Sequence, residues 1–261
     1  MPNPAQSGLP NAASYTISAS EREVTDDVTG LVWQRNLGST ALTWSEAGAY
    51  CACLTIDGGA GFRLPSRIEL ASLADWTRSA PSLDSRAFPS TPSESFWSSS
   101  ALNGDTELRF QVDFDSSHTT YSDPDYAYRT RCVRGGAAGA PPPLRYAIEG
   151  GTVLDTQTML TWQQRSPTES YTWGDAAAYC EALSLNGSGW RVPTIGELQI
   201  IVFDSSNPSI DEAAFPDTPS EYFWSSSLYA TDPARAWTGF FANGSTYGFF
   251  ITAPKNIRCV R

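Results

Sequence analysis

The sequence predicts an α+β fold that occurs twice in one chain. An ordered set of motifs in the first half recurs in the second half in the same order and at a nearly constant offset. The repeating unit is about 120 residues long, which is the size of a globular domain and too long for a solenoid repeat. The paired motifs are Trp33/Trp162, Trp44/Trp173, Cys51/Cys180, Arg63-Leu-Pro-Ser66/Arg191-Val-Pro-Thr194, Phe96-Trp-Ser-Ser-Ser100/Phe223-Trp-Ser-Ser-Ser227 and Arg131-Cys-Val-Arg134/Arg258-Cys-Val-Arg261.

The repeat divides the chain into four predicted parts. A leader without a pattern covers residues 1–14, and copy 1 follows over residues 15–134. A Gly/Ala/Pro linker over residues 135–145 is expected to be flexible at its Gly end and stiff at its Pro end. Copy 2 covers residues 146–261. Each copy is expected to fold around its own core.

Two helices are predicted in each copy from capping boxes, in which a Ser or Thr and an acidic residue three positions later satisfy each other's backbone amides. Copy 1 has Thr43-Trp-Ser-Glu46 and Ser66-Arg-Ile-Glu69, and copy 2 has Thr172-Trp-Gly-Asp175, a weaker form, and Thr194-Ile-Gly-Glu197. The first helix of each copy then has an apolar face at helical spacing. The faces are Ala47, Tyr50, Cys51 and Leu54, and Ala176, Tyr179, Cys180 and Leu183.

The remainder is predicted as loop and strand, with the strands mostly antiparallel. Leu31-Val-Trp33 and Leu160-Thr-Trp162 are short apolar segments that follow turns. Phe96-Trp97 and Phe223-Trp224 each begin a strand, alternating segments such as Leu108–Phe114 follow, and each copy ends in a Cys-Val strand. Two short helices combined with mostly antiparallel strands define an α+β domain.

The cysteines favour one disulfide in each domain. Each copy has one Cys on the apolar face of its first helix and one in the closing segment, so we pair Cys51 with Cys132 and Cys180 with Cys259. Such bridges indicate an oxidising compartment. Cys53 has no counterpart in copy 2 and projects to the other side of its helix. The first interpretation of Cys53 is a half-buried free thiol, and the second is an interchain disulfide or a metal contact.

Composition and charge limit the class of partner. Hydrophobic residues make up 41% of the chain and charged residues 17%, which is typical of a globular protein. The net charge of −11 repels nucleic acid and acidic membrane surfaces. No hydrophobic run reaches the length of a membrane span. A partner is therefore expected to be neutral or basic.

The sequence gives little basis for catalysis or for a cofactor. His118 is the one histidine, and it stands in a polar turn without a counterpart in copy 2. The serine runs lack the Gly-x-Ser-x-Gly elbow, and neither zinc spacing nor a phosphate-binding Gly-rich loop occurs. We expect no catalytic residue, no cofactor and no metal site. Calcium on oxygen ligands is the alternative to solvated acidic loops at Asp113, Asp115, Asp123 and Asp125.

Features that both copies retain are predicted to be structural. Arg63 with Glu69, and Arg191 with Glu197, could form a polar binding pair, but a helix cap with an internal salt bridge is the preferred interpretation. Trp97 and its counterpart in copy 2 are flanked by apolar residues and are assigned to the core.

Residues 101–130 and 228–257 differ most between the copies and are the predicted recognition surface. Aromatic, amide and hydroxyl side chains on loops suit adaptable recognition, including that of sugars. The alternative is that about half of these aromatic residues belong to the core. The candidate binding residues are Tyr121, Asp123, Asp125, Tyr126, Tyr128, Trp237, Asn243, Tyr247 and Phe249.

Three motifs carry a resemblance to a known family: Gly189-Trp-Arg-Val-Pro-Thr194, Phe223-Trp-Ser-Ser-Ser227 and Arg258-Cys-Val-Arg261. Together with the ordered Trp and Cys positions, they resemble the C-terminal domain family of the Lcl collagen-like adhesin. The resemblance covers both copies but not the leader or the linker. Copy 1 departs slightly, with Gly61-Phe-Arg-Leu-Pro-Ser66.

The resemblance implies a bacterial envelope or secreted protein with two tandem C-type lectin-like domains. In that fold a Cys of the first helix pairs with a Cys of the last strand. One family member binds sulfated glycosaminoglycans through a basic surface, and the acidic charge of this chain argues against that ligand. The lectin calcium–sugar signatures Glu-Pro-Asn, Gln-Pro-Asp and Trp-Asn-Asp are also absent from the sequence.

These observations predict a non-enzymatic, extracytoplasmic binding or adhesion module, which is secreted, periplasmic or at the cell surface. Its ligand is expected to be a glycan or a protein, bound by the divergent aromatic loops. Nucleic-acid binding and membrane insertion are not expected. The alternative function is a structural subunit of a cell-surface assembly or appendage, in which the same loops would support self-association.

Overall fold

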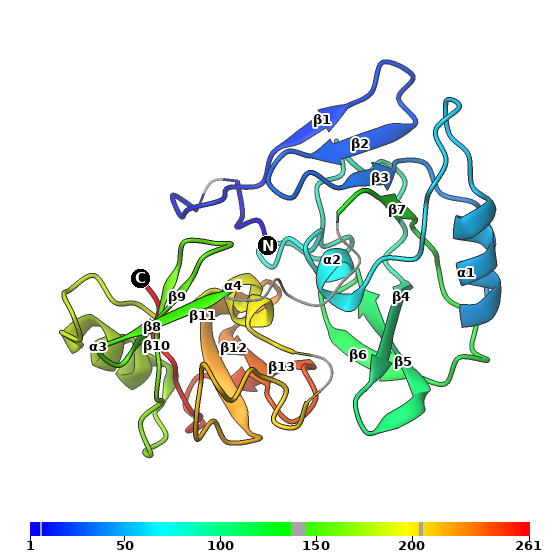
Figure 1. Cartoon of the computed structure of the whole chain (residues 1–261). Coiled ribbons are helices and arrows are strands. Elements are labelled where there is room, and N and C mark those ends of the chain that lie inside the picture. The colour runs from blue at the N-terminus through cyan, green and yellow to red at the C-terminus, as the bar shows by residue number, and fades with distance from the viewer. Residues whose placement is uncertain (6, 137–144, 204–205) are drawn as a thin grey trace. The chain divides into compact units, whose positions relative to one another are not determined.

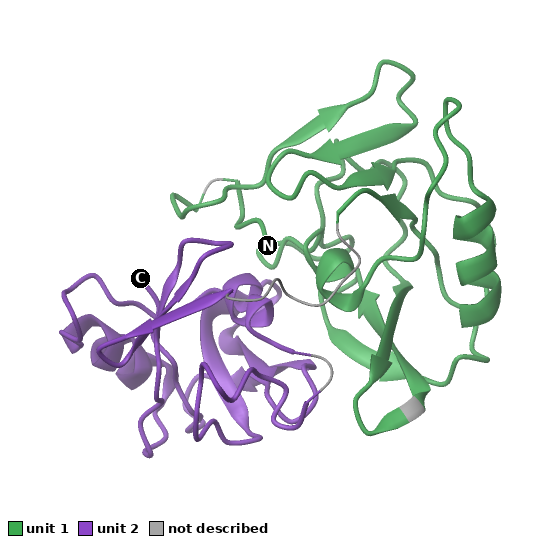
Figure 2. Ribbon diagram, in the orientation of Figure 1, with its two compact units in different colours: residues 1–138 green, residues 139–261 purple. Residues whose placement is uncertain are grey.

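The chain folds into two compact units, unit 1 over Met1–Ala138 and unit 2 over Gly139–Arg261 (Figures 1 and 2). In the described part of each unit, two short helices accompany antiparallel sheets, which confirms the predicted α+β class with mostly antiparallel strands. The computed structural model describes residues 1–5, 7–136, 145–203 and 206–261.

Unit 1 contains two antiparallel sheets, of strand order β1-β2-β3-β7 and β4-β5-β6. The second sheet is a meander, because each of its strands pairs with the next along the chain. In chain order the elements are β1 (Tyr15–Ile17), β2 (Glu23–Asp26), β3 (Val32–Gln34), α1 (Trp44–Cys53), α2 (Arg67–Ala71), β4 (Ser95–Leu102), β5 (Asp105–Asp113), β6 (Thr119–Ser122) and β7 (Val133–Arg134).

Unit 2 repeats this order with sheets β10-β9-β8 and β11-β12-β13. Its closing segment returns to the first sheet in the same way, since Val260 bridges Trp162 as Val133 pairs with Trp33. The elements are β8 (Tyr146–Glu149), β9 (Thr152–Asp155), β10 (Thr161–Gln163), α3 (Trp173–Ala182), α4 (Ile195–Ile200), β11 (Tyr222–Tyr229), β12 (Asp232–Phe240) and β13 (Thr246–Phe250).

The helices begin at the predicted caps. At α2 the Glu69 amide donates to Ser66 Oγ over 3.4 Å, and the Ser66 amide donates to Glu69 Oε2 over 2.8 Å. At α1 the Glu46 carboxylate accepts both the amide and the hydroxyl of Thr43, at 2.9 and 2.8 Å. Local side chains therefore satisfy amides that have no partner within the helix.

In each unit one disulfide joins the first helix to the closing segment, as predicted. Cys51 is bonded to Cys132 and Cys180 to Cys259, across sequence separations of 81 and 79 residues. Loops of that length restrict the unfolded chain and so contribute about 4 to 5 kcal/mol each. Cys53 is a free thiol but is exposed, not half-buried as predicted, because it stands in the last position of α1 on the face away from the core.

The repeated Phe-Trp-Ser-Ser-Ser motif fills five consecutive positions of β4 in unit 1 and of β11 in unit 2. Trp97 is fully buried and its indole Nε1 donates to Leu42 O over 2.9 Å, and Trp224 is buried in the same way in unit 2. This confirms the core assignment of both indoles. The Ser98 hydroxyl donates to Phe110 O over 2.9 Å, and thus joins β4 to β5.

The next two serines attach the strand to the start of α2. The Ser99 amide donates to Pro65 O over 2.7 Å, and Ser100 Oγ accepts the Arg67 amide over 3.0 Å. Unit 2 makes the same bonds from Ser226 to Pro193 O and from the Ile195 amide to Ser227 Oγ. The serine run is therefore a structural connector between strand and helix.

Arg131 and its counterpart Arg258 are fully buried and face no carboxylate in any described contact. Arg131 Nη1 donates to the carbonyls of Gln34 and Arg35 at 2.6 and 3.0 Å, and Nη2 donates to Thr91 Oγ1 at 2.7 Å. Burial lowers the pKa of both guanidinium groups to about 9, which leaves them charged at neutral pH.

The structure describes most of the predicted leader but little of the predicted linker. Within residues 1–14, Met1 packs against the core of unit 1 and Asn3 forms a β-bridge with Ala12. Most of the predicted linker lies outside the described residues.

Because unit 2 has its own caps, core and disulfide, we expect a fragment of residues 144–261 to fold without unit 1. Under oxidising conditions it should unfold in one cooperative transition, measured by circular dichroism in urea. A fragment that stays unfolded in oxidising buffer would show that the two copies depend on a shared core.

Replacing the buried Arg258 by Lys should destabilise unit 2 by about 3 kcal/mol or more, because an ammonium cannot reproduce the planar set of contacts. The matched control is Arg261→Lys in the same tetrapeptide. Arg261 lies over the Trp190 ring at 4.9 Å, and its replacement should cost less than about 1 kcal/mol. Equal losses in urea unfolding would contradict the assigned role of Arg258.

Candidate binding surfaces

Within each unit, the predicted recognition residues do not form one surface, because neighbouring residues of a strand point to opposite faces. Tyr121 packs edge-on against Phe110 at 6.1 Å, on the face of β5 that Arg67 of α2 covers. Trp237 is the counterpart of Phe110 and is only 1% exposed. The prediction for Trp237 is therefore wrong, since the residue belongs to the core and has no surface for a ligand.

The remaining candidates of unit 1 lie in the turn that follows β6. Asp123 Oδ1 accepts the Asp125 amide over 2.9 Å, and both side chains are exposed. Tyr126 is 62% exposed, with its ring 6.4 Å from that of Tyr128. Tyr128 itself is half-buried and packs on Trp97 at 4.8 Å. Tyr126 is thus the one fully exposed ring among these candidates.

In unit 2 a group of aromatic rings, denser than that of unit 1, lies on one face of the sheet β11-β12-β13. Helix α3 covers part of the same face. Tyr222 stacks on Phe240 at 4.2 Å and meets Tyr247 and Phe249 edge-on at 5.5 and 4.8 Å. The Lys255 ammonium lies 3.9 Å from the centre of the Phe249 ring. All five side chains are half-buried, so each presents part of its surface to solvent. We call these five residues the aromatic cluster.

The aromatic cluster has no equivalent in unit 1. The strand pairs Ser95↔Asp113 and Gln111↔Thr120 correspond to Tyr222↔Phe240 and Thr238↔Tyr247. At the five positions of the cluster, unit 1 has Ser95, Asp113, Thr120, Ser122 and Tyr128. The same backbone therefore carries an aromatic surface in unit 2 and a mainly polar one in unit 1.

The list of candidate binding residues left out three members of the aromatic cluster, Tyr222, Phe240 and Lys255, although Phe240 and Lys255 lie within the predicted stretch 228–257. Tyr222 stands directly before the retained Phe-Trp pair, and strand alternation from Trp224 would have placed it on the same face. Asn243, in contrast, belongs to the turn between β12 and β13, where its Oδ1 accepts the Ser245 amide over 3.0 Å.

The retained Arg–Glu pairs form the predicted internal salt bridges. Arg63 contacts both carboxylate oxygens of Glu69, at 2.7 and 2.6 Å, and Arg191 contacts Glu197 at 2.6 Å twice. Burial alone would raise the pKa of Glu69, but the hydrogen bonds from Arg63 and Ser66 outweigh it and hold that pKa below its usual value. These pairs close the start of α2 and α4 and are structural.

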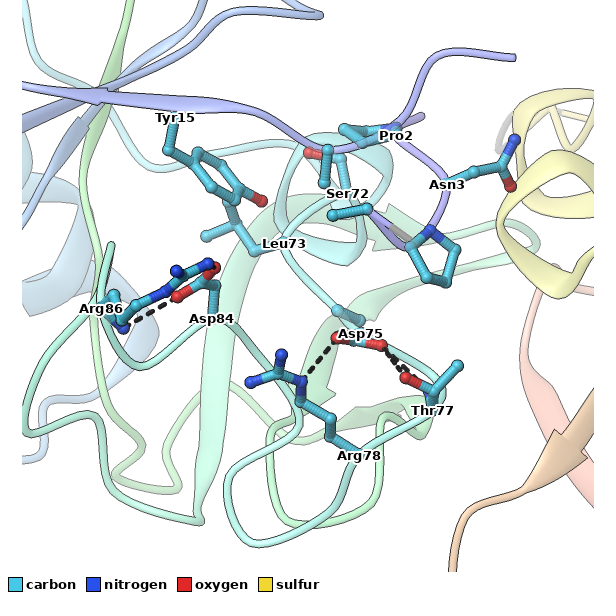
Figure 3. Close-up of a pocket in the computed structure, with 14 residues that line it drawn as sticks. Pro2, Asn3, Tyr15, Ser72, Leu73, Asp75, Thr77, Arg78, Asp84 and Arg86 are labelled. Atoms are coloured by element: carbon cyan, nitrogen blue, oxygen red, sulfur yellow. Dashed lines mark hydrogen bonds and ion pairs between the residues drawn. The ribbon is translucent and has the colours of Figure 1, made fainter. Parts of the chain in front are cut away.

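A polar pocket of about 160 Å³ lies in unit 1, between the end of α2 and the N-terminal segment (Figure 3). Tyr15, Asp75 and Asp84 line it. Arg78 and Arg86 pair with the two aspartates at 2.8 and 3.3 Å. Burial, followed by the charges of Asp26, Asp84 and Asp75, raises the pKa of Tyr15.

Each unit is a disulfide-bridged α+β domain, and the polar contacts that both units repeat are the structural ones. The family model of the Lcl C-terminal domain matches residues 22–134 and 151–261. The chain therefore belongs to the Lcl C-terminal domain family and contains two tandem copies of that domain. No curated protein matches the chain. In the described residues, none of the helices is long and apolar enough to span a membrane.

Chelation should leave the stability of the protein unchanged. Within the described residues, no three His, Cys, Asp or Glu side chains come together as a metal site, and Asp113 Oδ1 accepts the Asp115 amide at 2.6 Å. We expect the melting temperature with EDTA to equal that without it. A fall of several degrees that calcium reverses would reveal a site, because a metal that binds the folded state raises its stability.

Proposed function

We propose that this protein is a non-enzymatic, extracytoplasmic binding module whose main recognition surface is the aromatic cluster of unit 2. The observation that carries the proposal is the contrast between the units. The structural contacts are repeated, whereas four partly exposed rings and Lys255 occur in one unit only. A scaffold needs no such change, so a difference of this kind is best explained by selection for a ligand.

The chemistry of the aromatic cluster suits a glycan or a protein ligand. The rings supply apolar faces, the hydroxyls of Tyr222 and Tyr247 supply hydrogen bonds, and Lys255 supplies one cation. Rigid aromatic side chains bind at a small cost in conformational entropy. The net charge of −11 favours a neutral or basic partner.

The location and the finer fold follow from the same features. Both disulfides join the first helix to the closing segment, which supports an oxidising, extracytoplasmic compartment. The helix-to-last-segment bridge also supports a C-type lectin-like relationship for each unit. Membership of the Lcl C-terminal domain family favours a role at the bacterial surface.

The test is a glycan array and a protein pull-down with the full chain, followed by a double replacement in the cluster. Tyr247→Thr with Phe249→Ser introduces the residues that unit 1 has at these positions, Thr120 and Ser122, so the backbone is known to accept them. We expect binding to weaken by about 2 kcal/mol or more. That loss corresponds to roughly thirtyfold in Kd.

Tyr126→Ala in unit 1 is the matched control, since it removes an exposed ring outside the aromatic cluster. It should leave the affinity within about twofold of that of the unchanged protein. Unchanged binding after the double replacement, with the fold confirmed by circular dichroism, would remove the cluster from the site. Concentration-dependent self-assembly that the double replacement abolishes would favour the structural-subunit alternative.

A further inference from the structure

The aromatic cluster contains the only lysine of the chain. Lysine and arginine together number 17, and every member of this set except Lys255 is an arginine. The backbone of Lys255 is held as that of its counterpart Tyr128 is held. Lys255 exchanges two amide hydrogen bonds with Tyr171, at 2.8 and 2.9 Å, and Tyr128 does the same with Leu42. The two units therefore share the backbone of this position and differ in its side chain.

The side chain at this position has a packing role in unit 1 only. There the Tyr128 ring meets Trp97 edge-on at 4.8 Å. In unit 2 the Lys255 ammonium lies 3.9 Å from the centre of the Phe249 ring and 5.3 Å from that of Tyr222. A ring face attracts a cation electrostatically but offers no oxygen acceptor to its N–H groups. The rings therefore hold the ammonium in place and leave its donors for another partner.

The N–H donors of Lys255 find no acceptor within the described part of the chain, where neither an ion pair nor a hydrogen bond from Nζ accompanies the ring contacts. Arg235 shows the contrast, since it lies over the Phe250 ring at 4.5 Å and also pairs with Asp232 at 3.2 Å. Lys255 is half-buried, and its Nζ keeps contact with solvent. A ligand can therefore reach these donors.

A ligand on the aromatic cluster meets two kinds of surface side by side. The rings of Tyr222, Phe240, Tyr247 and Phe249 are half-buried and present apolar area to solvent. The ammonium lies over two of these rings, so a group that rests on them comes within reach of Lys255. The best ligand therefore has an apolar face with an acceptor oxygen beside it.

The size and the charge of the site favour a neutral sugar. A stable protein–protein interface engages about 20 to 30 residues on each side, which is far more than the cluster supplies. A sugar ring covers only a few side chains and combines a C–H face with polar substituents. The net charge of −11 opposes strongly anionic sugars. The acceptor that Lys255 meets is therefore expected to be strong without being charged.

Resting on the function proposed above, we propose that the aromatic cluster binds a neutral glycan containing an N-acetylated hexosamine, with Lys255 as the residue that determines specificity. The acetamido group has both required features, a methyl group that packs on a ring and a carbonyl oxygen that accepts from the ammonium. A hydrogen bond from a charged donor contributes more than one between neutral groups. A plain hexose lacks the methyl group and offers only a hydroxyl group at the same place.

The test uses the full chain with isotopic labels on its backbone amides and on lysine, followed by nuclear magnetic resonance. Since Lys255 is the only lysine, it gives the only lysine side-chain signals. The probes are two matched pairs of sugars that differ only at the second carbon, N-acetylglucosamine with glucose and N-acetylgalactosamine with galactose. We expect one or both N-acetylated sugars to shift the Lys255 side-chain signal and the Phe249 amide saturably. The plain partner should bind roughly tenfold more weakly or worse.

Lys255→Met removes the ammonium and keeps an unbranched side chain against the rings. It should reduce the preference for the N-acetylated sugar to less than about twofold, because the charged donor is gone. The matched control is Arg235→Met, which removes a cation from over a ring of the same sheet outside the cluster. That variant should keep the full preference, and circular dichroism should show that both variants are folded.

Three results would overturn the inference: no saturable binding of either N-acetylated sugar, equal affinity for the two members of each pair, or a preference that Lys255→Met retains. A ligand from the glycan array that binds the rings without moving the lysine signal would also overturn it, but would leave the function proposed above intact. Binding of an N-acetylated sugar that survives Tyr247→Thr with Phe249→Ser would contradict both proposals.

Discussion

The fold of each unit depends on a buried guanidinium group that is neutralised by no carboxylate in the described contacts. Arg258 donates to the carbonyls of Gln163 and Gln164 and to Thr218 Oγ1, and it lies over the ring of Phe215 at 4.9 Å. One side chain thus holds the closing segment, the end of β10 and the loop before β11 together. A buried charge is unfavourable unless hydrogen bonds compensate for the lost water. Because the loss of one such contact would destabilise the fold, the residues that supply them are expected to be retained as a set. This requirement explains why both copies retain a Phe and a Thr that contact the buried arginine, Phe88 and Thr91 in unit 1 and Phe215 and Thr218 in unit 2.

Local signals in the sequence were sufficient for the helices, the disulfides and the central strands. Capping boxes act within four residues, and a Cys in each half of a copy leaves one sensible pairing. The sequence did not predict the hairpins β1–β2 and β8–β9, because their strands are only three or four residues long and the outer strands β1 and β8 are mostly exposed. It also did not predict that the N-terminal segment packs on unit 1. That contact depends on the shape of a completed surface, which no local pattern encodes.

The site was harder to predict than the fold, for a related reason. Composition marked the stretches in which the two copies differ, but it carries no information on strand register, and a shift of one residue exchanges the buried and exposed faces. Trp237 was therefore assigned to the surface, although its place opposite Gly248 puts it in the core. Tyr222 lies outside the stretches that composition marked, although it stacks on Phe240. Lys255 reaches its aromatic neighbours from a segment with no regular structure, so only the folded chain shows the contact.

Duplication explains how one chain can carry two different surfaces without losing stability. Each unit retains the buried arginine, the Arg–Glu pair, the serine connector and the disulfide, and these contacts fix the backbone. Side chains outside them are then free to differ. In unit 2 the outer positions of the second sheet have become aromatic, while Arg145 keeps its first hairpin closed on Asp155. In unit 1 those outer positions are mainly polar, and Ser14 stands where unit 2 has Arg145. At both places the two units share the strand pairing and differ in their side chains.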